Sequence, residues 1–497
     1  MQAEAIALIN AIEQACDTRA LSYGGVGYWP LVRLRLWTTL IQRMVTGKKA
    51  ADADTVSNTG PAFAATGAAA EPVGPAALGL LRAAGSGATL PARADLLFFA
   101  RPEEHSDKTA SGMFAKVLDS VIERVPGPSA KLELSDPRTI GFSRARPSLF
   151  IDLGQAGAGL SFDPPSMLTG FTELKAAADK VADVTLDQAQ LATDMGKILY
   201  FARIFEKLLR ALGPKALVLS VYYHLVGMAW MLACRRAGVT SVDLQHGRLG
   251  PHHGLYTDLI AAPETGYDLM PDRVWCWGSR TVDDIARHMN PACTRHRGFA
   301  GGNAWLYKWR YGDASAFAPP ALAEFTARLR GSRVILVSLQ PLDTPAPPAL
   351  LEAMRRAPPD WFWLLRLHPL RRHTAPEIAA LLARAGVTRF EMDAATTFPL
   401  FTLLRLADHH VTAFSSVVVE AAAFDLRTSL TAPEGETIFA PEVARGVCRY
   451  TPTGDALLAH IGEVLSGERA PLASDFIDMR EGIVDRALTS ITDSTAS

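Results

Sequence analysis

Short apolar runs of strand length alternate with longer amphipathic stretches over most of this 497-residue chain. Such alternation of strand and helix predicts mainly parallel sheets that are covered by helices on both faces. In the first half of the chain, the predicted strands are Asp95–Ala100, Lys131–Leu134, Ser148–Leu153, Ala216–Val221, Ser241–Leu244 and Arg273–Trp277. The clearest helices of that half are Leu186–Leu212 and Leu225–Ala237.

A second series of strands and helices begins after Gly298–Asn303. Two successive α/β series predict two Rossmann-like domains that face a central cleft, and ligands of such sheets bind beyond the carboxyl ends of the strands. The predicted strands of the second series are Arg333–Leu339, Trp361–Leu367, Thr388–Glu391, His409–Ala413 and Thr428–Thr431, and its helices include Pro320–Leu329, Ala375–Ala385 and Ser416–Phe424.

Two regions lie outside both series. The N-terminus is predicted to be helical, and the stretch that follows is so rich in Ala, Gly, Pro, Ser and Thr that it predicts a flexible linker without a core. The predicted organisation is an N-terminal helical segment (1–47), a linker (48–93), an N-terminal Rossmann-like domain (94–303), a C-terminal Rossmann-like domain (304–470) and a C-terminal helix and tail (471–497).

The helix predicted over Tyr28–Arg43 mixes Trp and Leu with Arg33, Arg35 and Arg43. One interpretation places this helix on an anionic membrane surface, because basic residues beside Trp and Leu suit that interface. The other, which we favour, is a helix packed on the first domain with its arginines in solvent.

Composition narrows the choice of partners and compartment. The chain has 50 Lys+Arg against 51 Asp+Glu, a net charge of −1, which argues against a nucleic-acid partner. Its five cysteines form no CxxC pair, and this is typical of a reducing compartment. The N-terminus lacks the features of a signal peptide. We therefore expect a cytoplasmic protein. The helix rich in Trp and Arg suggests, as an alternative, peripheral contact with the cytoplasmic face of the inner membrane.

In the second series, Ser415 and Ser416 stand between a strand and a helix. A serine is a good N-cap, and the free amides of a first helical turn are a ready phosphate site. Glu420 lies one turn further on, where a carboxylate would accept hydrogen bonds from sugar hydroxyls. The alternative is a capped helix with one polar residue and no ligand.

A histidine and a proline, His368 and Pro369, follow another strand of the second series. Proline restricts the residue before it to extended geometry, so the imidazole is held in a loop at the strand's end, where it would donate to a phosphate. Arg366 would add positive charge, and Gln340 ends the preceding strand in the same way. The alternative is a loop histidine that caps the local backbone.

In the first series, the stretch Ser241–Asp258 combines a strand end with a loop rich in glycine and histidine. A metal site is disfavoured because no HExxH or similar pattern holds the rings together. A general base is more natural, since the pKa of histidine lies near neutrality. The candidates are His246 as base, Asp243 as its orienting carboxylate despite the odd spacing on the strand, and Gln245, Gly247, His252 and His253 as the loop that meets an acceptor.

The chain contains the motifs QHG (245–247), HP (368–369) and SSVVVEA (415–421) in this order. With these motifs it resembles the GT-B glycosyltransferases of bacterial capsule and lipopolysaccharide biosynthesis, and it is most similar to the Kdo transferase and polysialyltransferase group. This resemblance implies transfer of a sugar from a nucleotide-sugar donor to a growing glycan or lipid-linked glycan, without metal or cofactor. It further implies that His368, Ser415 and Ser416 bind the donor nucleotide, and that His246 is the base of an inverting enzyme.

The sequence departs from the sialyltransferase pattern after the first strand of the first domain. Glu103 and Glu104 stand there, but Arg101 and Pro102 precede them and no glycine follows. The resemblance leaves open whether the donor carries CMP, UDP or GDP, and whether Asp243 is a nucleophile in a retaining mechanism. Two other functions remain as alternatives: a sugar-nucleotide epimerase or hydrolase on the same scaffold, and a non-catalytic nucleotide-binding scaffold protein.

Overall fold

The computed structural model describes residues 1–46, 81–82, 93–134, 142–151, 167–247, 249–340, 346–468, 471–472 and 474–493. The chain divides into two compact units. Unit 1 comprises Met1–Ala304 together with Arg480–Ser497, and unit 2 comprises Trp305–Met479. The predicted linker 48–93 lies outside the described residues, apart from Leu81–Arg82 and Arg93.

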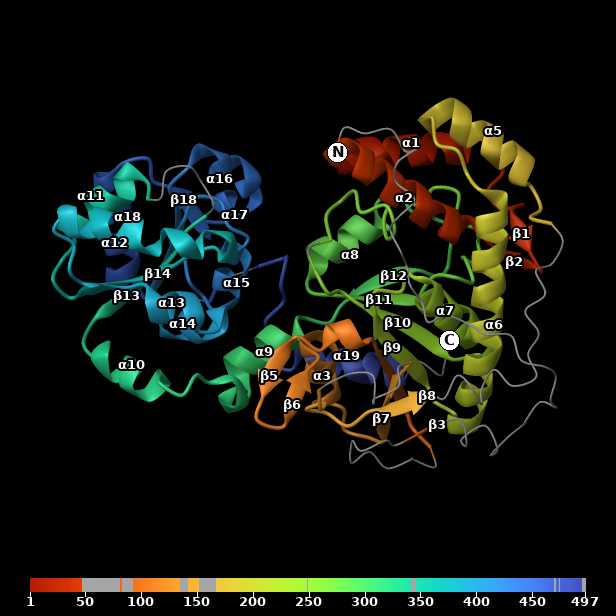
Figure 1. The fold of residues 1–497 in the computed structure, drawn as a ribbon, viewed down its shortest axis with the longest axis horizontal. Coiled ribbons are helices and arrows are strands. Elements are labelled where there is room, and N and C mark those ends of the chain that lie inside the picture. The colour runs from red at the N-terminus through yellow and green to blue at the C-terminus, as the bar shows by residue number, and fades with distance from the viewer. Residues whose placement is uncertain are drawn as a thin grey trace. The chain divides into compact units, whose positions relative to one another are not determined.

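Unit 1 is built on an eight-stranded sheet in the order β12-β11-β10-β9-β4-β7-β8-β3, in which β3 alone is antiparallel to its neighbour (Figure 1). The central strands are runs of apolar residues because both faces of a parallel sheet are covered. Its strands are β3 (Leu81–Arg82), β4 (Leu96–Ala100), β7 (Ser129–Glu133), β8 (Leu149–Ile151), β9 (Ala216–Ser220), β10 (Thr240–Leu244), β11 (Arg273–Cys276) and β12 (Arg297–Ala300).

Helices and two small hairpins complete unit 1 (Figure 1). The longest helix, α6 (Gln188–Leu212), begins where Asp187 accepts a hydrogen bond from the backbone of Gln190, and ends at Gly213 in left-handed conformation. The other elements are α1 (Gln2–Ala15), β1 (Ser22–Tyr23), β2 (Val26–Gly27), α2 (Trp29–Thr46), η3 (Pro102–Glu104), β5 (Asp107–Thr109), β6 (Gly112–Phe114), α3 (Lys116–Ile122), α5 (Phe171–Ala182), α7 (Leu225–Ala237), α8 (Ser279–Ala286) and α19 (Ile483–Thr492).

The N-terminal segment is part of the core of unit 1. Apolar residues of α1 and α2 belong to the same hydrophobic cluster as the helices and strands of the sheet. The arginines of α2, expected in solvent or on a membrane, are instead held by the protein: Arg33 is 1% exposed and pairs with Glu13, and Arg35 pairs with Asp194. Arg43 donates to backbone carbonyls at the end of α5. The basic face that membrane contact required is therefore occupied by internal contacts.

Unit 2 contains a six-stranded, fully parallel sheet in the order β15-β14-β13-β16-β17-β18 (Figure 1). Its strands are β13 (Arg333–Ser338), β14 (Trp361–Arg366), β15 (Phe390–Glu391), β16 (His409–Thr412), β17 (Thr428–Leu430) and β18 (Cys448–Tyr450). Its helices are α9 (Ala304–Tyr311), η4 (Ser315–Phe317), α10 (Leu322–Arg328), α11 (Pro348–Arg356), η5 (Pro369–Thr374), α12 (Ala375–Arg384), α13 (Asp393–Thr397), α14 (Leu400–Leu406), α15 (Val417–Ala423), α16 (Pro433–Ile438), α17 (Ala440–Ala444) and α18 (Gly454–Ser466).

The predicted fold class of two α/β, Rossmann-like domains is confirmed. Each of the eleven strands predicted between 95 and 431 has a counterpart in the sheets. In the two main sheets, the prediction missed β3, which falls within the predicted linker, and two further edge strands, β12 and β18. Both include charged or small residues, because an edge strand is covered less completely than a central one and needs a shorter apolar run.

The C-terminal helix was predicted as a separate tail after residue 470, but α19 belongs to unit 1. Asp485 of α19 accepts a hydrogen bond of 2.8 Å from Arg124, and Arg273 at the start of β11 donates to the carbonyl of Ser490. Among the described helices, none combines the length and the hydropathy that a membrane span requires.

Candidate active site

Three neighbouring strands of unit 1 carry titratable side chains directly after their carboxyl ends. In the sheet, β9 lies between β4 and β10, so the loops that follow these strands meet at one edge. Arg101 and Glu104 follow β4, Tyr223 and His224 follow β9, and His246 follows β10. Each of these five residues is partly exposed, whereas the ends of the strands beneath them are buried. We call this group the unit 1 edge.

Glu104 is the carboxylate of this edge. Its Oε1 accepts hydrogen bonds from Arg101 Nε at 2.9 Å and from Ser220 Oγ at 3.1 Å, and its side chain is 11% exposed. Burial raises the pKa of Glu104 to about 7, although Arg101 and Ser220 act in the opposite direction. Its Oε2 has no hydrogen-bond partner within the described part of the chain. A carboxylate with this pKa is suited to accept a proton near neutral pH.

His246 lies at the same edge, as the sequence predicted. Its Nε2 is 3.1 Å from the hydroxyl of Tyr223, and burial together with the charge of Arg101 lowers the pKa of the imidazole. The ring is therefore a weaker proton acceptor than an ordinary histidine. Glu104, which the sequence analysis did not include among its candidates, is the better placed base.

His224 caps the N-terminus of α7. Its Nδ1 accepts a hydrogen bond of 3.2 Å from the backbone of Gly227, so in the neutral ring the proton is on Nε2. Burial and the charge of Arg101 lower the pKa of His224 to about 3, which keeps the ring neutral at physiological pH.

Asp243 does not fill the role that the sequence suggested. The residue is 0% exposed, and its Oδ2 accepts a hydrogen bond of 2.6 Å from Tyr256 and a longer one from the backbone of Tyr222. Its pKa is raised to about 7 by burial. Because a substrate cannot reach a fully buried carboxylate, the nucleophile role is wrong, and Asp243 holds Tyr256 in place. Asp243 and His246 are an odd number of positions apart, so their side chains point to opposite faces of the sheet and do not pair.

The predicted acceptor loop is held from behind by the N-terminal helix α2. Arg33 donates to the carbonyls of Gly254 and Thr257, the latter at 2.8 Å. The ring of Trp37 stacks on that of His253 with 5.6 Å between centroids. The pKa of His253 is lowered to about 4, chiefly by burial. The N-terminal segment thus fixes the position of His253 beside the unit 1 edge.

The remaining loop candidates have other contacts. Gln245 is buried and bridges the backbone, since its Oε1 accepts from Trp277 N at 2.7 Å and its Nε2 donates to the carbonyl of Gly247 at 2.9 Å. His252 points to a different partner, with Nδ1 at 3.9 Å from Asp258. Gln245 is therefore structural rather than part of an acceptor surface.

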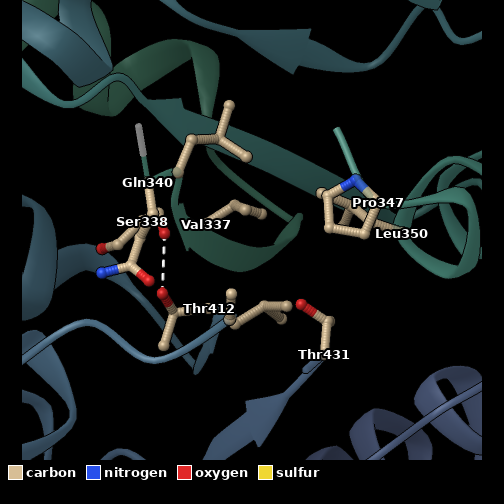
Figure 2. A pocket seen from close by; sticks show the side chains of 10 residues that line it. Val337, Ser338, Gln340, Pro347, Leu350, Thr412 and Thr431 are labelled. Atoms are coloured by element: carbon tan, nitrogen blue, oxygen red, sulfur yellow. Dashed lines mark hydrogen bonds between the residues drawn. The ribbon is translucent and has the colours of Figure 1, made fainter. Parts of the chain in front are cut away.

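In unit 2, the candidates follow strands that are also neighbours. The order β14-β13-β16-β17 brings the loops after these strands to one edge, which we call the unit 2 edge. A hollow at this edge is lined by residues of β13, β16, β17 and α11. Figure 2 shows the polar side chains of Ser338, Gln340 and Thr412 gathered on one side and those of Pro347 and Leu350 on the other.

Hydrogen bonds fix the backbone around this hollow. Thr412 Oγ1 donates to the carbonyl of Ser338 at 2.7 Å, which Figure 2 marks with a dashed line. Gln340 Oε1 accepts from the backbone of Phe414 at 3.1 Å, so the end of β13 is tied to the loop that carries Ser415. Ser416 is the N-cap residue of α15 but is exposed and makes no side-chain cap, whereas the Oγ of Ser415 before it accepts from Val417 N at 3.3 Å.

His368 and Arg366 are both partly buried but differ in their contacts. His368 Nδ1 accepts from the backbone of Leu370 at 3.3 Å, so a neutral ring carries its proton on Nε2 and offers a donor, while Pro369 beside it is exposed. Arg366 Nη1 donates to the carbonyls of Ala395 and Phe398 at 2.9 and 2.7 Å. Arg366 therefore stabilises the turn at α13. Its contacts do not support the predicted role in binding the nucleotide-sugar donor.

Glu420 of α15 is partly buried, and desolvation of its carboxylate raises its pKa to about 7. Its Oε2 has no hydrogen-bond partner among the described residues. Within those same residues, no group of three or more His, Cys, Asp or Glu side chains is arranged to hold a metal ion.

No protein-family model and no curated protein matches the chain. Solved structures with a similar arrangement include a UDP-GlcNAc 2-epimerase from Methanocaldococcus jannaschii (11% identity, 80% of this chain and 99% of that one, TM-score 0.46) and another UDP-N-acetylglucosamine 2-epimerase (12%, 82% and 98%, TM-score 0.46). A third is the glycotransferase of kitacinnamycin (15%, 81% and 95%, TM-score 0.37). Because the identities are below 25% and the TM-scores below 0.5, these likenesses assign no activity to this chain.

Proposed function

We propose that this protein is a metal-independent glycosyltransferase in which Glu104 of unit 1 is the general base and the unit 2 edge binds a nucleotide-sugar donor. The observation that carries the proposal is the state of Glu104: a carboxylate with a pKa of about 7, anchored through one oxygen, while the other oxygen is buried and has no partner among the described residues. Perturbed carboxylates of this kind are typical of catalytic sites.

The chemistry of transfer divides between the two edges. Glu104 takes the proton of the acceptor hydroxyl as that oxygen attacks the anomeric carbon, where positive charge develops in the transition state. The nucleotide leaves as an anion, and the Nε2–H of His368 with the hydroxyls of Ser415 and Ser416 would stabilise it. Preorganised neutral donors are effective because they need no reorganisation when the charge appears.

The acceptor class follows from the resemblance of the three motifs to enzymes of bacterial surface glycans. We assign transfer to a growing capsular polysaccharide or lipopolysaccharide, with a cytoplasmic location and a glycan or lipid-linked glycan as acceptor. The base of the donor nucleotide is left to experiment.

A binding screen with CMP, CDP, UDP, GDP and dTDP tests the donor site by calorimetry. One nucleotide should bind, and replacing both Ser415 and Ser416 by alanine should weaken its binding about 30-fold, since two lost hydrogen bonds on the order of 1 kcal/mol each total about 2 kcal/mol. Ser466→Ala at the exposed end of α18 is the matched control. Equal affinity of the double variant and the control would remove these serines from the donor site.

A sugar-nucleotide epimerase or hydrolase is the second candidate, because a carboxylate such as Glu104 would equally well remove a proton from a sugar carbon or from water. Product analysis with the bound nucleotide-sugar separates the two: an epimer or free sugar formed without acceptor supports the alternative. Tight binding without any turnover on a broad acceptor panel would support a non-catalytic scaffold protein instead.

A further inference from the structure

A cluster of charged side chains is buried directly behind the turn that carries Glu104. Asp119 and Glu133 are 0% exposed, Lys131 is 4% exposed and His105 is 5% exposed. Arg144 belongs to the same cluster through its guanidinium, which is also nearly inaccessible. None of these residues takes part in the chemistry proposed above, and burying so many charges costs free energy unless each is paired.

The charges of the cluster balance without a contribution from His105. Lys131 Nζ is 2.7 Å from Asp119, and Arg144 binds the carboxylate of Glu133 through two nitrogens at 3.2 and 2.9 Å. A protonated His105 would add a third positive charge to two carboxylates, and its nearest acid, Glu133 with Oε1 at 3.6 Å from Nε2, already binds Arg144. Burial, and then the ammonium of Lys131, lower the pKa of His105, while Glu133 and Asp119 act in the opposite direction.

The partners of His105 fix its tautomer. Lys131 Nζ lies 3.0 Å from Nε2, and an ammonium is only a donor, so Nε2 must accept. The proton of the neutral ring is therefore on Nδ1. This nitrogen is 3.3 Å from the carbonyls of both Arg101 and Pro102, and it donates to them.

The same two carbonyls close the turn η3. The backbone of Glu104 donates to the carbonyl of Arg101 at 3.1 Å, and the backbone of His105 donates to that of Pro102 at 3.2 Å. A three-residue turn has no further hydrogen bonds of its own, and isolated turns of this kind are weak. The imidazole adds a second donor to each carbonyl and ties the turn to the buried cluster.

We propose that His105 is a positioning residue: Lys131 holds its imidazole in the Nδ1–H tautomer, and this imidazole clamps the turn that aims Glu104 at the substrate. The inference rests on the proposed function for the role of Glu104, but the tautomer and the clamp are properties of the chain itself. Asp119, which also accepts from the backbone of Ala115 at 2.8 Å, anchors Lys131 in turn.

Two substitutions of His105 separate the clamp from simple burial. In His105→Asn, the side-chain amide lies near the position of Nδ1 and can still donate to the turn. In His105→Gln, the amide lies near the position of Nε2, so it can face Lys131 but cannot donate to the turn. We expect His105→Asn to keep kcat within about threefold of the wild type, and His105→Gln to lose about 100-fold in kcat with KM unchanged, since a displaced catalytic group costs about that much. Equal losses in both variants would overturn the clamp.

The pH profile gives a second readout. In His105→Gln the freed turn exposes Glu104 to water, which lowers the pKa of its carboxyl. The apparent pKa on the acid side of the pH profile of kcat/KM should therefore fall from about 7 towards the ordinary carboxylate value of 4.5. Arg35→Met breaks an ion pair elsewhere in unit 1 and is the control for general loss of stability; its acid limb should stay in place. A limb that moves equally in the control would also overturn the proposal.

The tautomer can be measured without any substrate. NMR of the protein labelled with ¹⁵N in histidine, with His105→Asn used for assignment, should show Nδ1 protonated and Nε2 bare at pH 7.5. In Lys131→Met this signature should disappear. An Nε2–H tautomer in the wild type at this pH would refute the inference, whereas the absence of transferase activity alone would refute only the proposed function.

Discussion

The two edges differ in the kind of polar group they present. The unit 1 edge contains titratable groups whose pKa values are displaced: that of Glu104 is raised to about 7, and that of His224 is lowered to about 3. At the unit 2 edge, hydroxyls and an amide predominate, as in Ser338, Gln340 and Thr412 (Figure 2). Both edges are built from the same type of sheet.

This difference separates proton transfer from binding. Displaced pKa values arise where burial acts on a charge that nearby groups only partly compensate, and such sites are typical of catalysis. Hydroxyls and amides carry hydrogen bonds at every pH and are suited to hold a ligand in one orientation. Unit 2 also contains groups with displaced pKa values: Glu420 of α15, whose pKa is raised to about 7, and His409 and His410, which are within the sheet and fully buried.

The largest expected effect comes from Glu104→Gln. Loss of the base should lower kcat about 1,000-fold, within the range measured for general bases, without changing nucleotide binding. In the wild type, kcat/KM should fall about tenfold for each pH unit below about 7, because Glu104 must be ionised to accept a proton. Steady-state kinetics between pH 5 and 9 measure both.

The neighbouring Glu103 provides the control, since its side chain is 64% exposed and Glu103→Gln should leave kcat unchanged. If His246→Ala abolished transfer while Glu104→Gln did not, His246 would be the base as the sequence first indicated. That outcome would also weaken the contrast between the two edges.

Gly254→Ala tests whether the N-terminal segment supports the unit 1 edge. A Cβ at this position would lie 2.2 Å from Cε3 of Trp37, so either the loop or α2 must move. We expect a loss of about 3 kcal/mol in the free energy of unfolding, typical of overpacking, together with lower kcat because His253 is displaced. Urea unfolding and kinetics measure these effects.

Gly247→Ala is the matched control in the same loop region, because nothing lies within 4 Å of a Cβ there. Its stability should match that of the wild type. Equal losses in the two variants would mean that the loop tolerates no substitution and that contact with Trp37 is not the cause.

The smallest effect concerns the buried histidines of unit 2. His410 bridges Thr428 and Ser338 at 3.0 Å each, and burial lowers its pKa to about 3. The unfolded chain binds a proton at this histidine below pH 6.5 and the folded unit does not, so stability is complete above that pH and is lost as the pH falls. Between pH 7 and 5 the loss for His410 should be about 2 kcal/mol.

Urea unfolding at the two pH values measures this loss, and His410→Gln should reduce the difference between them. His373→Gln, at an exposed position, should not alter it. A pH dependence that is the same in the wild type and in His410→Gln would mean that His410 does not resist protonation in the fold.

Local sequence patterns are enough to predict the two α/β series, the central strands of both main sheets and the strand ends where polar residues gather. Apolar runs such as Ala216–Ser220 are decided locally, because a strand covered on both faces must be apolar along its length. The predictions of His246, Gln340, His368 and Ser415 at carboxyl ends follow from the same local pattern.

Only the tertiary structure decided which of those groups are reachable and what state they are in. No local feature of the sequence distinguishes Glu103, which is exposed, from Glu104, whose pKa is raised to about 7 by burial. Nor does the local sequence show that Asp243 is buried and hydrogen-bonded to Tyr256. The sequence pattern predicted exposed arginines in α2, because their ion-pair partners, such as Glu13 and Asp194, are outside that helix in the sequence. Burial and pairing depend on residues that only the folded chain brings together, and these two effects set the pKa of a group.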